Sequence, residues 1–119
     1  MIRLLVLGLL VAAPALAQDG RRVFDNHCAS CHSVDAAAPP GAGPNLAGVM
    51  GRAVGGAPGF DYSPVLDAAR GAGDRWDADR MVRFLEDPEE MYPGLWMGSN
   101  GVRGEADRAA IAAFLQSVR

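Results

Sequence analysis

The stretch Cys28-Ala29-Ser30-Cys31-His32 decides how this chain folds. Two thiols separated by two residues and followed directly by an imidazole are the pattern for covalent attachment of a c-type haem. Each sulfur adds across one vinyl group of the porphyrin, and His32 can then place a ring nitrogen on the iron from one face. The remaining residues must in that case supply a ligand for the other face, cover an apolar disc and bind two propionates.

The same residues are compatible with three other kinds of site. A redox dithiol formed by Cys28 and Cys31 belongs in a thioredoxin-like strand–helix context, and the sequence has no such strand. A disulfide between the two cysteines would form in an oxidising compartment. A tetrahedral zinc site would draw on two nitrogens and two sulfurs, from His27, Cys28, Cys31 and His32. Zinc modules separate their ligand pairs by about a dozen residues or more, so this tight cluster favours haem.

The first seventeen residues have the pattern of a secretory signal peptide. Residues 1–3 carry one positive charge, an apolar run follows over residues 4–13, and Ala15-Leu16-Ala17 supplies a small-x-small cleavage site. We expect cleavage after Ala17, which leaves residues 18–119 as one domain without membrane insertion. An uncleaved anchor is the alternative, although the apolar run is short for a membrane span. These features favour a bacterial periplasm.

The chain is acidic and contains no Lys. Its 119 residues carry 11 basic and 14 acidic side chains, and the loss of Arg3 with the signal peptide leaves a formal charge of −4. This balance argues against nucleic acid or an anionic membrane surface as a partner. A chain of about a hundred residues builds a modest core, to which a large buried cofactor would add apolar contacts.

Apolar periodicity and capping residues predict an all-α fold with several helices and two long loops. The predicted helices run from about residue 19 into the haem motif and over residues 64–70, 77–86 and 105–118, with Asp19, Ser63 and Asp77 as N-caps. Residues 33–58 and 89–101 are predicted to be irregular. A loop as long as the first is unusual in a compact domain, but it becomes reasonable if it wraps around a bound disc.

With these residues in place, the mature chain resembles the mitochondrial-type class I cytochrome c family over nearly its whole length. The resemblance implies the cytochrome c fold, in which helices and long loops wrap around one covalently bound haem c. It rests on the haem motif and on a series of further motifs in order: Gly20 and Phe24, Gly43-Pro44-Asn45-Leu46, Gly51-Arg52, Ala57-Pro58-Gly59-Phe60, Tyr62, Trp76, Phe84-Leu85-Glu86-Asp87-Pro88, Pro93-Gly94 and Met97.

The resemblance also implies how the iron is held. Cys28 and Cys31 would form the thioethers, His32 would be one axial ligand and Met97 the other, a pairing that raises the reduction potential. The backbone carbonyl of Pro44 would bind the second ring nitrogen of His32, which fixes the tautomer. Met91 shares the predicted loop with Met97 and is the alternative sulfur ligand.

Further positions are implied to support the propionates and the packing. Tyr62 and Trp76 would donate hydrogen bonds to a buried propionate, and Arg52 would lie nearby as its charge partner, because a buried carboxylate without partners is costly. The N-terminal helix would cross the C-terminal helix near Ile111 and Phe114, where Gly20 lets the two backbones approach.

The sequence also departs from the family pattern. Phe84 stands where the family often has a Tyr whose hydroxyl reaches the ligand sulfur. Leu95 and Trp96 replace a Thr and a Lys, and the ring of Lys around the haem edge is missing. We expect an apolar docking patch with Trp96 at its rim, since transient redox encounters need only small contacts. The alternative is that Trp96 folds back into the core.

These features predict a monomeric electron carrier that cycles between Fe(II) and Fe(III) and is not an enzyme. Its partners would be redox proteins, a donor dehydrogenase or complex and an acceptor oxidase or reductase, which dock transiently at the haem edge. A haem subunit of a periplasmic dehydrogenase, or a dedicated acceptor for one, is an alternative. A haem enzyme or gas sensor with a labile sixth ligand is another. No acid pair or Ser-His-Asp set suggests catalysis independent of haem.

Overall fold

The computed structural model describes residue 8 and residues 13–119, so most of the predicted signal peptide lies outside the described residues. Within that part the chain forms five helices: α1 (Ala13–His27), α2 (Pro64–Gly71), α3 (Ala78–Glu86), α4 (Pro88–Met91) and α5 (Glu105–Ser117). The only β-type pairing among the described residues is an isolated bridge between Ala53 and Arg75, which confirms the predicted all-α class. None of these helices is both long and apolar enough to cross a membrane.

Helix α1 begins earlier than predicted. It starts at Ala13, so Asp19 lies inside the helix and is not its N-cap. The reason is the alanine-rich stretch that precedes Asp19 in the full-length chain, because alanine has the highest helix propensity and nothing there interrupts the helix. The other end agrees with the prediction, since α1 stops at His27 and delivers the chain directly into the haem motif.

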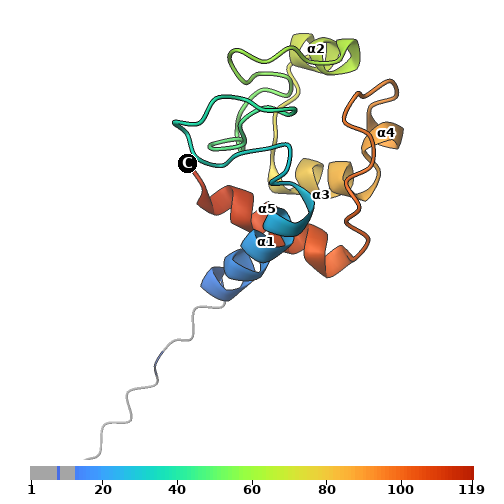
Figure 1. The fold of residues 1–119 in the computed structure, drawn as a ribbon. Helices are drawn as coiled ribbons and strands as arrows, with labels where there is room; N and C mark the ends of the chain where they lie inside the picture. Colours follow the sequence, from blue (N-terminus) through green and yellow to red (C-terminus); the bar gives the residue numbers. More distant parts are fainter. Residues whose placement is uncertain (1–7, 9–12) are drawn as a thin grey trace, which may run out of the picture.

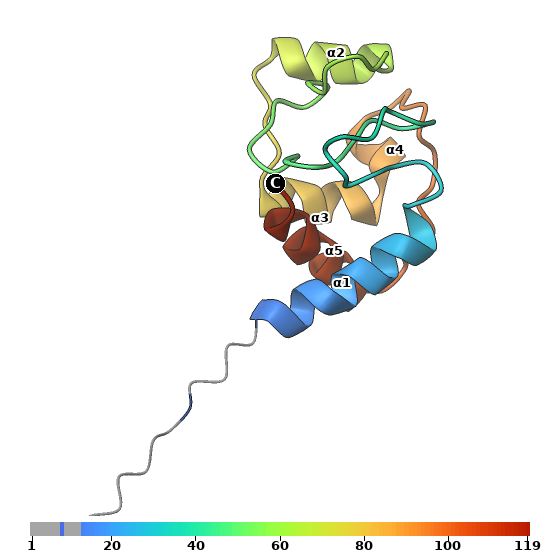
Figure 2. The same ribbon diagram turned by 60° about the vertical axis from the view of Figure 1, so that its left-hand side comes forward.

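Helices α1 and α5 cross in close contact, as Figure 2 shows. A Cβ atom built on Gly20 would overlap the backbone carbonyl of Ala110, so only glycine allows this approach. Next to the crossing, the rings of Phe24 and Phe114 pack with their centroids 5.4 Å apart. The predicted contact of the two terminal helices is therefore confirmed. Each fully buried large side chain here, such as Ile111, contributes about 1.5–3 kcal/mol through removal from water.

Two aspartates organise α3 and α4. The Asp77 carboxylate accepts a hydrogen bond from the backbone N–H of Arg80 (2.8 Å), which confirms the predicted cap of α3. The Asp87 carboxylate accepts one from the N–H of Glu90 (3.1 Å) and so starts α4 at Pro88. The prediction that residues 89–101 are irregular throughout is thus wrong at its beginning, because Asp87 and Pro88 together are a helix-start signal.

Ser63 precedes α2 as predicted, but its side chain does not cap the helix. Its hydroxyl is buried and has no hydrogen-bond partner among the described residues. Pro64 at the first helical position, with its preset φ and no N–H to satisfy, starts α2 without a side-chain cap.

The long first loop is irregular, as predicted for residues 33–58, and it is held by its own polar contacts. The Asn45 amide donates to the carbonyls of Asp35 (2.6 Å) and Ala38 (3.1 Å), and the Arg52 guanidinium donates to the carbonyls of Asn45 (2.8 Å) and Ala47 (2.6 Å). Figure 1 shows α1, α3 and α5 grouped at one end of the molecule and α2 at the other, with the loops between them.

Candidate haem site

The helices and loops enclose a mostly apolar cavity of about 340 Å³. Its walls come from the end of α1, both long loops and helices α2, α3 and α5. The apolar lining is supplied mainly by Phe24, Leu46, Val49, Leu66, Met81, Phe84, Leu85, Leu95, Ile111 and Leu115. All eight predicted site residues, Cys28, Cys31, His32, Pro44, Arg52, Tyr62, Trp76 and Met97, also line it. A second depression, beside α4, is lined largely by polar residues and contains none of these eight.

The two cysteines lie on a tight turn that continues from α1. The N–H of Cys28 donates to the carbonyl of Phe24 (2.7 Å), and the N–H groups of Cys31 (3.1 Å) and His32 (3.0 Å) both donate to the carbonyl of Cys28. This turn places both sulfurs and the imidazole on one cavity wall. The thiols are not joined in a disulfide. Burial and the neighbouring Cys31 raise the pKa of Cys28 to about 11, so its thiol is protonated at neutral pH.

The His32 ring is held in one tautomer. Its Nδ1 lies 2.8 Å from the Pro44 carbonyl oxygen, which confirms the predicted contact. A carbonyl can only accept, so Nδ1 carries the proton and Nε2 keeps its lone pair. Burial lowers the pKa of His32 and the bond to Pro44 opposes this, so the ring is neutral at pH 7. A neutral imidazole with a free Nε2 is the form that binds a metal.

Gly43 makes room for this ring. A Cβ atom built on Gly43 would overlap the His32 imidazole and lie 2.6 Å from Nδ1. Any side chain at position 43 would therefore push the ring away from the Pro44 carbonyl.

The zinc alternative is not supported by the geometry. In the described part of the chain, no three His, Cys, Asp or Glu side chains gather closely enough to hold a metal ion. His27, which a zinc site would need, is exposed at the end of α1.

Two methionines line the cavity, and Met91 is not one of them. Met97 lies at the mouth with 40% of its surface exposed, whereas Met81 is buried on α3 among the core residues. Met91 packs against the core outside the cavity, so it does not share the position of Met97. Met91 is the alternative that the sequence suggests because it shares the predicted loop with Met97, but the second methionine at the cavity is Met81.

Two hydroxyl-bearing residues, Tyr62 and Ser63, also line the cavity. The Tyr62 hydroxyl accepts a hydrogen bond from the N–H of Ala57 (3.0 Å), which leaves its own proton free to donate. Burial raises the pKa of Tyr62, so this proton stays in place at neutral pH. Ser63 adds its buried, unpartnered hydroxyl. Sequence reasoning missed Ser63 because a serine before a proline is also a typical helix start.

A buried hydroxyl without a partner costs about 1–3 kcal/mol, and a polar group of a bound molecule would remove that cost. The site also has the donor set and the environment that a haem requires, namely a thiol pair, a neutral imidazole, a thioether and apolar walls. The residues present therefore fit this cofactor.

Comparison with known proteins decides the family. The family model described as cytochrome c matches residues 17–119. Cytochrome c2 of Rhodomicrobium vannielii is 40% identical over 96 residues, which cover 81% of this chain and 74% of that protein. Cytochrome c2 iso-1 of Magnetospirillum molischianum is 41% identical over 79% of this chain and 92% of its own. Cytochrome c of Stellaria longipes is 35% identical over 84% of this chain and 90% of its own.

The chain belongs to the cytochrome c family. As a class I c-type cytochrome it carries one covalently bound haem c with iron, and it is an electron carrier that exchanges electrons with redox partners, not an enzyme. The relatives include plant and bacterial proteins, so family membership alone does not assign a compartment.

The contact between Gly43 and His32 gives a direct test of this cytochrome's site. Gly43→Ala should displace the His32 ring at a cost of about 1–3 kcal/mol through overpacking and lower the yield of haem-loaded protein. The measurement is haem absorbance per mole of purified protein. Ala42→Ser, at the exposed neighbouring position, is the control and should load normally. Equal loading of both variants would contradict the proposed importance of this contact.

Proposed function

We propose that this cytochrome is a secreted, periplasmic electron carrier whose iron is held between His32 and Met97. The observation that carries the proposal is that the neutral His32 ring, fixed by Pro44, lines the same cavity as the Met97 thioether. When bound, the haem supplies a one-electron Fe(II)/Fe(III) couple. A Met and His ligand pair would raise the reduction potential of that couple.

The cavity residues have separate tasks in this proposal. Cys28 and Cys31 anchor the porphyrin covalently, so the cofactor is not lost between reactions. His32 would offer Nε2 while its Nδ1–H stays bound to Pro44, a bond that fixes the orientation of the ring. Met97 would be the second ligand and would keep water and small ligands from the iron, which would favour electron transfer over binding chemistry.

The polar residues of the lining would bind the propionates. Tyr62 and Ser63 can each donate a hydroxyl proton, and Trp76 can donate its indole N–H. Arg52 contributes positive charge at the same wall, while its guanidinium remains bonded to two loop carbonyls. This arrangement would solvate a buried carboxylate and would tie the first loop to the cofactor.

The sulfur ligand can be identified by substitution. Met97→Ala should abolish the weak long-wavelength absorption band that a thioether ligand gives to ferric haem, and it should let the ferrous protein bind carbon monoxide. Met91→Ala, which changes a methionine outside the cavity, is the matched control and should keep the band. If the band survived in Met97→Ala and was lost in Met91→Ala, the proposed ligand would be wrong.

Secretion is supported by the sequence before the domain. The family match begins at residue 17, next to the small residues of Ala15-Leu16-Ala17. Cleavage after Ala17 would leave α1 starting near Gln18, with the contacts of Gly20 and Phe24 to α5 intact. The mass of protein recovered from the periplasm of an expressing bacterium should equal residues 18–119 plus one haem. Retention of residues 1–17 in membrane-bound material would support an uncleaved anchor instead.

Part of the cavity's rim offers a docking surface without charge. Residues 28–34, 41–46 and 94–100, here called the uncharged collar, contribute twelve residues to the cavity lining and contain no Asp, Glu, Lys or Arg, whereas Arg52 and Asp61 line the cavity outside the collar. Trp96 stands in this collar with 69% of its surface exposed, so it does not fold back into the core. Exposed aromatic side chains carry much of the binding energy in protein contacts. We infer that redox partners dock here through an apolar contact with little electrostatic steering.

The docking role of Trp96 can be tested with the natural partner. Trp96→Ala should weaken transient association and slow second-order electron transfer about tenfold, while Trp96→Phe should recover most of the rate. Ionic strength should change the rate of the natural protein less than it would for a contact through paired charges, because the collar carries no charge and only the overall acidic charge of the chain is screened. The reduction potential of each variant must be measured, since Trp96 adjoins Met97. An unchanged rate in Trp96→Ala, or a steep salt dependence, would contradict this docking surface.

A further inference from the structure

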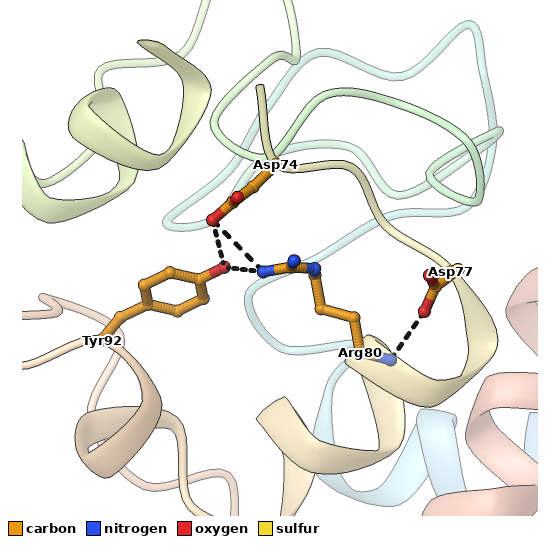
Figure 3. Close-up of polar contacts among 4 residues, drawn as sticks. All are labelled: Asp74, Asp77, Arg80 and Tyr92. Carbon is orange, nitrogen blue, oxygen red and sulfur yellow. Dashed lines mark hydrogen bonds and ion pairs between the residues drawn. The ribbon is translucent and has the colours of Figure 1, made fainter. Parts of the chain in front are cut away.

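A polar cluster outside the cavity joins three segments of its wall (Figure 3). The Arg80 guanidinium donates to the Tyr92 hydroxyl (2.9 Å) and pairs with the Asp74 carboxylate (3.2 Å). The Tyr92 hydroxyl is 3.5 Å from the same carboxylate, toward which its proton can point. We call these three side chains the Tyr92 clasp. Asp77, also shown in Figure 3, binds the backbone of Arg80 and is not part of it.

Each member of the clasp belongs to a segment that supplies a cavity residue. Asp74 lies in the connection from α2 to α3, two residues before Trp76. Arg80 lies on α3 next to Met81. Tyr92 is the first residue after α4 and begins the segment that leads to Met97.

The segment from residue 92 to residue 100 is tied to α3 at both ends. At its start, the Tyr92 hydroxyl binds Arg80 of α3. At its end, the Asn100 amide donates to the carbonyl of Leu85, also on α3 (2.9 Å). Between these ends, the N–H of Leu95 donates to the Tyr92 carbonyl (3.1 Å), and the Ser99 hydroxyl accepts a hydrogen bond from the N–H of Gly101 (3.4 Å). Met97 therefore sits on a span that is held by its two attachments to α3 and by the buried side chain of Leu95.

Tyr92 is well placed to act as the first attachment. Its side chain is 6% exposed, and its ring packs at 6.1 Å from Phe84, which in turn packs at 5.0 Å from Trp76. The phenol is thus the polar end of a buried aromatic row along the cavity wall. Its partners Arg80 and Asp74 are about one-quarter to one-third exposed, so solvent screens the ion pair and the bond to the buried phenol matters more.

We propose that the Tyr92 clasp positions the segment that carries Met97 and thereby keeps its sulfur on the iron. This inference rests on the proposed ligation by Met97. Tyr92, Arg80 and Asp74 touch neither the cavity nor the reacting atoms, so they are positioning residues. The segment of residues 92–100 can be attached to α3 or released from it. Loss of a hydrogen bond to a charged partner shifts the equilibrium between these two states by about tenfold. A ligand that binds only the released state then binds tighter by the same factor.

Titration of the ferric holoprotein with imidazole measures this equilibrium, because imidazole competes with the sixth ligand. Tyr92→Phe removes the phenol and keeps the ring, so its apparent Kd for imidazole should fall about tenfold. Arg80→Gln should have a similar effect, and the double variant should add little, since both changes break the same contact. Asp77→Ala, which removes the cap of α3 and leaves the clasp, is the matched control and should bind imidazole like the natural protein.

Met97→Ala separates the inference from the proposed ligation. If Met97→Ala binds imidazole no more tightly than the natural protein, the assignment of Met97 fails. If Met97→Ala binds much more tightly but Tyr92→Phe does not, the ligation stands and the clasp is overturned. The clasp is also overturned if Tyr92→Phe and Asp77→Ala lower the Kd equally, because the effect would then follow general stability. A lower Kd in Tyr92→Phe and Arg80→Gln alone supports it.

Discussion

The hydrogen bond between His32 Nδ1 and the Pro44 carbonyl is the contact on which the site depends. It ties the haem motif to the first long loop and selects the tautomer that leaves Nε2 free. It also explains the neighbouring sequence, because Gly43 must lack a side chain for the ring to reach Pro44. The loop is in turn held by Asn45 and Arg52, so a segment without regular structure still presents one carbonyl at a defined place.

The remaining helices form the other walls of the cavity and close it. The crossing of α1 and α5 at Gly20 forms the base, and α3 carries the contacts that hold the segment of Met97. Family membership establishes the covalent haem c and electron transfer. This chain contains no Lys, and Trp96, which lines the cavity, is exposed.

Much of the fold could be predicted from the sequence, because many of its elements depend on residues that lie close together in the chain. The Asp77 cap and the helix predicted from about residue 105 depend on neighbours within a few residues, and the structure agrees with both. The predictions failed where distant residues or competing signals decide. Ser63 has the features of a helix cap, yet its hydroxyl is buried without a partner, and the residue lines a cavity built largely by other segments. Helix α4 was not predicted, because a proline can both end one helix and start another, and Pro88 starts α4 directly after α3.

The most direct test of the account is an NMR spectrum of the reduced protein labelled with carbon-13 in its methionine methyl groups. A methyl group bound against the porphyrin is shifted far upfield by the ring current. The account predicts one such signal, which disappears in Met97→Leu, while the methyl signals of Met50, Met81 and Met91 remain near their usual positions. A shifted signal that belongs to Met81 or Met91, or no shifted signal at all, would contradict an iron held between His32 and Met97.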